Sequence, residues 1–459
     1  MRIRMVAASV VCIGIALSGS AFGRVVRVGP TEKYPTISSV SSSLAPGDVV
    51  EVTGDVTDKA VLTRHGTWDK PITVRGLARV EKGNILRPRI LPADPTVKPR
   101  FALVCMGRWY VIEGLEFSGT EAPPNAMVSG IKHSCENLTV RNCYFHHFSA
   151  HAIGGTPEAG SITVEFCEFD SNGSSSTPYE NRQTVDLFSD IPWARAEMRH
   201  CYFHDGTGGN LLNSRFPRNV VRYNWFESAY SNSLYIIDSV SVGVTEQTDP
   251  LYPMHSDIVG NVFFQGWSAG VPWSTIRLGG EDSSATGTEG DFNIAHNLFV
   301  NTNGGMDPGV AVGVQGNVDN VKLYNNVFLD YGTKEFKLYW RGNVWEGLRT
   351  QWFRERRGHG EPILSGSNNW VSTKAVEIPE GLARTIRGLD PRFADLLGFD
   401  FRPRKDSPLV GAGLWPLPRG QIVDLVPEYE PQRGIPVDLK ARPRRKVTPP
   451  SIGPFEAAR

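Results

Sequence analysis

The chain has 459 residues, with 48 basic and 48 acidic side chains and no formal net charge at neutral pH. This balance excludes whole-molecule attraction to a polyanion, so we expect no nucleic-acid partner, and any anion site must be local. After residue 23, no segment approaches the roughly 18 consecutive apolar residues of a membrane-spanning helix, so we expect no membrane partner either.

Residues 1–23 have the features of a secretory signal peptide. Arg2 and Arg4 precede the apolar run VAASVVCIGIALSG, and small residues follow as far as Gly23. An apolar core of this length behind basic residues is typical of a cleaved signal rather than of a membrane anchor. We therefore expect an exported protein, periplasmic or extracellular.

Residues 24–110 are expected to form an N-terminal cap and the first coils of a repetitive structure. Within them, residues 34–53 (YPTISSVSSSLAPGDVVEVT) predict a short amphipathic helix, a Pro-Gly turn and a strand. Such a unit would cover the end of the repeat, which otherwise exposes an apolar cross-section and a sheet edge.

Residues 111–375 contain a five-residue motif that occurs eight times. Its copies are EGLEF (113–117), RNCYF (141–145), EFCEF (165–169), RHCYF (199–203), RYNWF (222–226), VGNVF (259–263), AHNLF (295–299) and YNNVF (324–328). The third residues are Leu115, Cys143, Cys167, Cys201, Asn224, Asn261, Asn297 and Asn326, and Phe follows two positions later in all eight. RGNVW at 341–345 is a candidate for one further irregular coil. The motif is constant while the connections vary in length.

Short strands with variable connections at this period predict an all-β fold, a parallel β-helix with coils stacked about 4.8 Å apart. Equivalent inward side chains then form ladders. We predict a stack of the motif Phe residues, an amide ladder from Asn224 to Asn326, and buried free thiols at Cys143, Cys167 and Cys201. A metal site made by these three cysteines is the functional alternative.

Residues 376–459 are expected to hold the last coil and an extended Pro- and Arg-rich segment that runs along the solenoid. The two ends of the mature chain together resemble a known superfamily. The relevant residues are Tyr34, Thr36-Ile37 and Pro46-Gly47-Asp48 near the start, and Ser407-Pro408, Gly411-Ala412-Gly413 and Ile452-Gly453-Pro454-Phe455-Glu456 near the end. This pattern resembles the pectate-lyase-like superfamily of secreted bacterial proteins. The resemblance implies a right-handed, single-stranded parallel β-helix, a fold that hosts many functions.

A narrower resemblance lies at residues 208–224, GGNLLNSRFPRNVVRYN. This segment is similar to one in the alginate lyase and chondroitinase B group, and Arg215 falls where that group has a catalytic Lys. Gly208 and Asn210 fall where the group has calcium-binding glutamates, so we predict no cofactor and expect the calcium site to be absent. Ile237 or Asp238 falls where the group has its catalytic Arg.

Polar residues also recur on the second strand of each coil, after the motif. They are His151, Asp186, Asn213, Arg215, Tyr235, Asp238, Arg277 and Glu281. If these strands stack, the side chains line one outer face, with Arg215, Asp238 and Arg277 on successive rungs. Long loops at 172–182, 239–257 and 280–291 would wall this face. Trp273 is placed to stack on a sugar ring.

These residue types suit β-elimination from a uronate. The carboxylate next to the acidic C5 proton must be neutralised, a base must remove that proton, and an acid must help the leaving oxygen. We assign Arg215, Arg277, Tyr235 and Asp238 as catalytic. His151, Asp186, Asn213, Glu281 and Trp273 are assigned to substrate binding, and no residue is assigned to a metal.

Four alternatives stay open at this point. Asp186 and Asp238 could instead serve an inverting glycoside hydrolase. A C5-epimerase would use the same proton abstraction as a lyase, and a non-catalytic carbohydrate-binding surface protein would need none. Arg215, Asp238 and Arg277 could also be only a stabilising ladder of alternating charges. The expected partner is an acidic polysaccharide or oligosaccharide, bound by a monomer.

Overall fold

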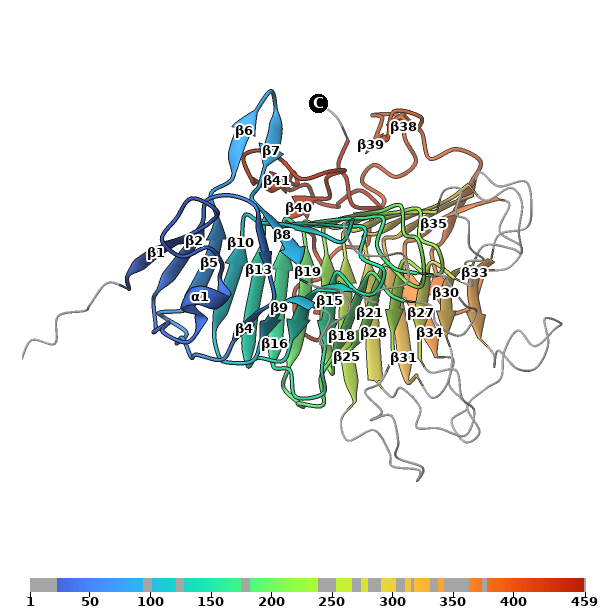
Figure 1. Ribbon diagram of the computed structural model, residues 1–459. Helices are drawn as coiled ribbons and strands as arrows, with labels where there is room; N and C mark the ends of the chain where they lie inside the picture. The colour runs from blue at the N-terminus through green and yellow to red at the C-terminus, as the bar shows by residue number, and fades with distance from the viewer. Residues whose placement is uncertain are drawn as a thin grey trace, which may run out of the picture.

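The computed structural model describes residues 23–93, 101–120, 128–174, 182–237, 253–265, 274–279, 290–302, 310–314, 318–330, 337–341, 363–373 and 378–457. Over these residues the chain winds into coils of three short strands. Equivalent strands of successive coils pair in parallel, which gives three long sheets stacked along one axis (Figure 1). The predicted parallel β-helix is confirmed.

The three sheets are named A, B and C in the order in which a coil visits them. Sheet A contains β1 (Val25–Val28), β2 (Val49–Val52), β5 (Ile72–Gly76), β10 (Tyr110–Glu113), β13 (Asn137–Arg141), β16 (Ser161–Glu165), β19 (Arg195–Arg199), β22 (Arg218–Arg222), β25 (Met254–Val259), β28 (Gly290–Ala295), β31 (Asn320–Tyr324), β34 (Leu364–Ser367) and β36 (Leu382–Ala383). Sheet B contains β3 (Val56–Asp58), β8 (Arg89–Pro92), β11 (Glu116–Ser118), β14 (Tyr144–His146), β17 (Glu168–Asp170), β20 (Tyr202–His204), β23 (Trp225–Glu227), β26 (Val262–Gln265), β29 (Leu298–Asn301), β32 (Val327–Asp330), β35 (Trp370–Ser372) and β37 (Ile386–Gly388). Sheet C contains β4 (Ala60–Leu62), β9 (Phe101–Cys105), β12 (Ser129–His133), β15 (Ile153–Gly155), β18 (Val185–Phe188), β21 (Leu212–Arg215), β24 (Leu234–Ile236), β27 (Ile276–Leu278), β30 (Val310–Val314) and β33 (Lys337–Arg341).

The motif Phe residues form a continuous stack inside sheet B. Neighbouring rings from Phe117 to Phe328 are stacked, with centroids 4.5 to 5.2 Å apart. The stack arises because strand side chains alternate between the two faces, so one motif position always points inward. The predicted aromatic stack is confirmed.

The predicted amide ladder is also confirmed, at the bend between sheets A and B. Asn224 Nδ2 donates to Asn261 Oδ1 (3.0 Å), Asn261 to Asn297 (2.9 Å) and Asn297 to Asn326 (3.1 Å). The ladder continues from Asn326 to Asn369 (3.0 Å), a step that the sequence motif did not predict. All five side chains are fully buried.

Cysteines occupy the same inward position in the preceding coils. Cys143, Cys167 and Cys201 are buried and unpaired, as predicted. Each thiol donates to a backbone carbonyl of the coil before it, at 3.6 to 3.7 Å. These contacts explain the three cysteines as packing residues, without a metal site.

A short helix covers the N-terminal end, as predicted. Helix α1 (Ser38–Ser41) lies against β4, and Ile37, Val40 and Leu44 are buried beneath it (Figure 1). No helix within the described ranges is both long and apolar enough to cross a membrane. A small hairpin, β6 (Arg79–Glu81) and β7 (Asn84–Leu86), projects from the side of the solenoid.

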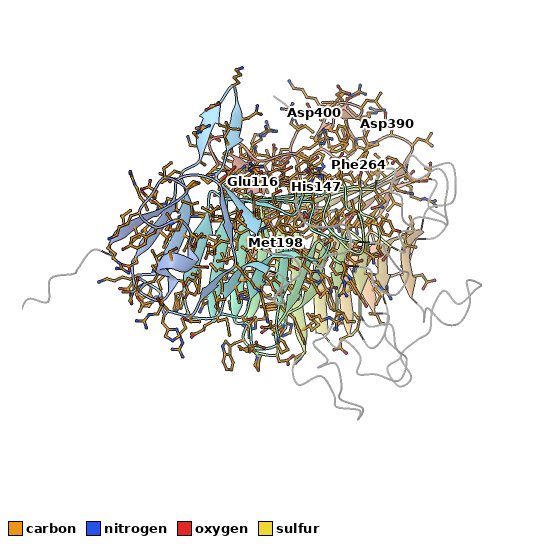
Figure 2. The ribbon with its side chains drawn as sticks, viewed as in Figure 1. Glu116, His147, Met198, Phe264, Asp390 and Asp400 are labelled. Atoms are coloured by element: carbon orange, nitrogen blue, oxygen red, sulfur yellow. The ribbon has the colours of Figure 1, made fainter. Side chains whose placement is uncertain are left out.

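The C-terminal segment packs along the outer face of sheet B. It contains two hairpins, β38 (Phe393–Asp395) with β39 (Asp400–Pro403), and β40 (Tyr429–Glu430) with β41 (Arg442–Pro443). A second apolar core joins Phe393, Phe401, Leu409, Ile452 and Phe455 to the outward side chains of Trp225, Val262, Leu298, Val327 and Trp370. In Figure 2, Phe264 marks this part of sheet B and Asp400 marks the segment above it. A buried ion pair, Arg444–Glu456 at 2.6 Å, fixes the end of the segment.

Candidate functional site

The outer face of sheet A carries a ladder of charges that has a structural explanation. Glu113, Arg141, Glu165 and Arg199 are register neighbours. Glu113 pairs with both Arg75 and Arg141 at 2.5 Å, and Arg199 pairs with Glu165 at 2.7 Å. Because each guanidinium of this row has a carboxylate on a neighbouring coil, the row stabilises the sheet surface.

The N-terminal half of sheet B carries histidines and carboxylates on its outer face, in the region that Glu116 and His147 mark in Figure 2. Asp170, His204 and Asp205 lie close enough together to hold a cation. However, His204 Nε2 bonds Glu168 Oε1 (3.2 Å) and Nδ1 bonds Asp205 Oδ2 (2.8 Å). Burial lowers the pKa of His204, but these two hydrogen bonds outweigh it and raise the pKa to about 9. In this arrangement the imidazole is protonated at neutral pH and forms an ion-paired cluster with the surrounding carboxylates.

This cluster predicts a pH-dependent stability. The folded pKa of His204 lies above its unfolded value of about 6.5, so its contribution is complete below that pH and is lost as the pH rises through about 9. We expect wild type to lose about 2–3 kcal/mol more unfolding free energy between about pH 6 and pH 9.5 than His204→Gln. Urea denaturation at both pH values measures this difference. An equal loss in the two proteins would contradict the assignment.

The outer face of sheet C carries a polar row of a different kind. Asp186, Asn213, Tyr235 and Arg277 are consecutive register partners on β18, β21, β24 and β27. The row exists because each strand alternates, with apolar residues such as Val185, Leu212, Leu234 and Ile276 pointing into the core. Four of the residues assigned to the site from the sequence are thereby brought together.

The basic end of the row is formed by Arg277 and Tyr235. The guanidinium carbon of Arg277 lies 4.7 Å from the centroid of the Tyr235 ring, and both residues are 7 % exposed. The stacking holds the planar guanidinium in one orientation, which suits recognition of a carboxylate. In the adjacent coil, Asn213 Oδ1 is buried and has no hydrogen-bond donor among the described residues.

The acidic end of the row is formed by Asp186 and His151. Asn213 Nδ2 donates to Asp186 Oδ1 at 2.6 Å, and His151 Nε2 lies 3.8 Å from Asp186 Oδ2. His151 Nδ1 donates to the carbonyl of Gln183 at 2.8 Å. Because a carbonyl only accepts, the proton of neutral His151 is on Nδ1, and Nε2 is left to accept a proton on the side of Asp186.

The predicted arrangement of Arg215 with Arg277 is wrong in register. Arg215 also points outward from β21, but it lies two residues beyond the row and pairs in register with Phe188. Arg277 pairs with Tyr235 of β24, which pairs in turn with Asn213 of β21, so Arg215 and Arg277 do not occupy the same row. Asp238, Glu281 and Trp273 lie outside the described residues, as do most of the three predicted loop walls.

The polar row of sheet C also continues toward the N-terminal end of the solenoid, which the sequence did not indicate. Lys132 on β12 is the register partner of Gly154, which in turn pairs with Asp186. Its Nζ lies 5.8 Å from the ring centroid of Phe101. The sequence did not mark Lys132 as a member of the row, because the distance from the motif to this row varies from coil to coil.

The residues present do not fit the calcium site of the lyase group. Gly208 has no side chain to offer a ligand. Asn210 Oδ1 accepts from Asn232 Nδ2 (2.7 Å) and from the Asn232 amide (3.1 Å) in the next coil. Asn232 Oδ1 accepts in turn from the Ser274 amide at 3.0 Å, so Asn210 begins a second polar ladder. Its side-chain oxygen serves the fold at this position.

Comparisons with known proteins agree on the fold. Residues 107–249 match the family model described as the right handed beta helix region. Pectate lyase Pel9A is 13% identical, over 96% of this chain and 98% of that one, with a TM-score of 0.52. An alginate lyase from Paenibacillus sp. is 13% identical, over 80% of this chain and 99% of that one, with a TM-score of 0.41. No curated protein sequence matches the chain. The family model and the likeness to pectate lyase Pel9A show the fold alone, a right-handed parallel β-helix, and the chemistry must be argued from the residues.

Proposed function

We propose that this protein is an exported polysaccharide lyase that cleaves a uronate-containing polysaccharide by β-elimination on the outer face of sheet C. The observation that carries the proposal is the in-register row Asp186–Asn213–Tyr235–Arg277. Unlike the ladder on sheet A, this row does not alternate in charge. The guanidinium of Arg277 at one end of the row and the His151–Asp186 pair at the other are separated by about three coil spacings, roughly 14 Å.

In the proposed reaction, Arg277 binds the carboxylate of the uronate. Guanidinium neutralises the charge that develops when the C5 proton leaves, and a buried guanidinium does so more effectively than an exposed one. The Asn213 amide lies one coil from Tyr235 and two coils from Arg277, and it offers a further polar contact to the sugar. The proposal requires no metal ion for this step.

Proton abstraction falls to Tyr235 or His151. The base takes the C5 proton, the electron pair forms the C4–C5 double bond, and the C4–O bond breaks. The departing oxygen takes up a proton from an acid or from water. Tyr235 is in contact with Arg277, whereas His151 Nε2 is available beside Asp186. A Tyr235→Phe variant and a His151→Gln variant separate the two choices.

The residues of this row support a glycoside hydrolase less well than a lyase. An inverting glycosidase needs two carboxylates about 6.5–9.5 Å apart. Within the described part of the row Asp186 is the one carboxylate, and Asn213 and His151 already contact it. An epimerase would share proton abstraction but would leave the glycosidic bond intact.

The experiment is incubation of the purified protein with a panel of uronates: polygalacturonate, alginate and a glycosaminoglycan. We expect ultraviolet absorbance from the new C4–C5 double bond with at least one polymer. New reducing ends without that absorbance would mean a hydrolase. Inverted C5 stereochemistry without cleavage would mean an epimerase, and no change in any polymer would refute an enzymatic role on uronates.

A further inference from the structure

A pocket lies away from the candidate site, between sheet B and the C-terminal segment. Its volume is about 400 Å³, within the range of small-ligand sites. Its floor is Trp225 of β23, and its walls come from residues 399–402, 431–436 and 442 of the C-terminal segment, with Phe455. Trp225 on β23 belongs to the same coil as Tyr235, which lies on the next strand, β24 of sheet C. The pocket and the proposed catalytic row therefore lie at the same level of the solenoid on different faces.

The pocket concentrates positive charge in a chain that is neutral overall. Arg402, Arg433 and Arg442 line it against one acidic residue, Asp400. Asp400 pairs with Arg402, Nε to Oδ1 at 2.7 Å. Arg433 forms a bidentate ion pair with Glu227, donating to its two carboxylate oxygens at 2.8 and 2.9 Å.

Arg442 differs from the other two arginines. It is exposed on β41, and within the described ranges no carboxylate lies within ion-pair distance of its guanidinium. Asp400 and Glu430 lie near enough for their charges to act on Arg442. Its exposed guanidinium forms no ion pair with either of them and can bind a carboxylate that enters from solvent. Local positive charge of this kind is what an anion site requires in a chain without net charge.

The rest of the lining is mainly apolar, with Gln432 as its polar member. Trp225 stacks on Phe401 with ring centroids 5.4 Å apart, and the guanidinium carbon of Arg433 lies 4.0 Å from the Phe399 ring centroid. Pro431, Ile435 and Pro436 complete the apolar wall. A wall of this kind beside a guanidinium suits a ligand with a C–H-rich ring and one carboxylate, rather than a bare inorganic anion.

We propose that this pocket is an accessory binding site for one carboxylated sugar unit of an acidic polysaccharide, held by Arg442. The inference rests on the proposed function for the identity of the polymer, but not on catalysis. A chain of linked units bound here and at sheet C would be held by the same coil on two faces. Two linked sites raise the effective concentration of substrate without a new catalytic contact.

The test is calorimetric binding of uronate oligomers to the full chain carrying Arg277→Ala, so that turnover does not interfere. We expect this protein to bind a uronate oligomer and Arg442→Ala in the same background to weaken binding about tenfold or more. Arg445→Ala is the matched control, because Arg445 is an exposed neighbour that does not line the pocket, and it should bind normally. Arg442→Lys keeps the charge but not the fork, and intermediate affinity is expected.

Three results would overturn the inference: unchanged affinity in Arg442→Ala, equal binding of a neutral oligosaccharide of the same length, or equal competition by inorganic sulfate. The two proposals also fail separately. A wild-type protein that cleaves no uronate but binds one through Arg442 would sink the lyase proposal alone. A lyase whose oligomer binding ignores Arg442 would sink the accessory site alone. Arg442→Ala should not change the melting temperature of the Arg277→Ala protein, because the Arg442 side chain is exposed.

Discussion

Replacing Arg277 with alanine should lower turnover of the cleaved uronate by about 10²–10³-fold, the usual cost of removing one group that stabilises developing negative charge. The loss should lie mainly in kcat, because neutralisation matters most as the C5 proton leaves. Arg277 is nearly buried on the Tyr235 ring, so truncation also removes packing. Arg277→Lys keeps a charge and most of the stem, yet it should still lose most of the activity because the bidentate fork is missing.

The matched control for this experiment is Arg218→Ala. Arg218 is exposed on β22 of sheet A, in the same coil as Tyr235, and it lies on a different face from the row. Turnover should be unchanged in this variant. If Arg277→Lys retained full turnover while its melting temperature fell, Arg277 would be a packing residue. The proposed mechanism would then have no group to neutralise the substrate carboxylate. Turnover by Arg215→Ala shows separately whether a guanidinium outside the row contributes to catalysis.

The interior of the fold could be predicted because its signal is local. The motif holds the last part of a sheet A strand, the bend and the sheet B strand, so its five residues keep a fixed relation in every coil. The Phe stack and the Asn ladder follow directly from that relation. Asn369 was missed because Val371 stands where the other copies have Phe. The candidate copy at 341–345 falls on β33 of sheet C at its first residue, and its other residues lie outside the described part of the chain.

The register of the site could not be predicted because its signal is not local. Connections between sheets B and C differ in length from coil to coil, so counting from the motif does not identify register partners. This is why Arg215 and Arg277 were placed on one ladder, whereas the strand pairing puts Asn213 opposite Tyr235. Four members of the row could nevertheless be predicted, because their residue types suit the chemistry. Lys132 could be identified only from the observed strand pairing.

The sequence contains a further pattern that indicates where the C-terminal segment covers sheet B. The fourth motif residue is Glu or Tyr in the first four copies, then Trp225, Val262, Leu298 and Val327 in the last four. This position points outward, so the change from polar to apolar marks where another element must cover the sheet. The covering element begins more than 60 residues after the last copy. Its contacts, such as Arg433 with Glu227 across 206 residues, have no periodicity to reveal them.

The amide ladder should be the most sensitive part of the fold to substitution. Asn261 Nδ2 donates to Asn297 Oδ1 and to the Val221 carbonyl, and its Oδ1 accepts from the Asn224 amide and side chain. Asn261→Ala would leave several of these buried groups without partners, and water cannot reach them. We expect the free energy of unfolding to fall by about 3–4 kcal/mol. Urea denaturation measures the change.

The control for Asn261→Ala is Asn320→Ala, whose amide also bonds a side chain of the neighbouring coil, Asp291 at 2.9 Å, but in an exposed position. Water replaces that partner, so the loss should stay below about 1 kcal/mol. Asn261→Ser serves if the alanine variant does not fold, because its hydroxyl adds no charge and can keep one hydrogen bond of the ladder. Its loss of unfolding free energy should lie between the losses of Asn261→Ala and Asn320→Ala. If Asn261→Ala cost no more than Asn320→Ala, the ladder would be a consequence of coil stacking and not a cause of its stability.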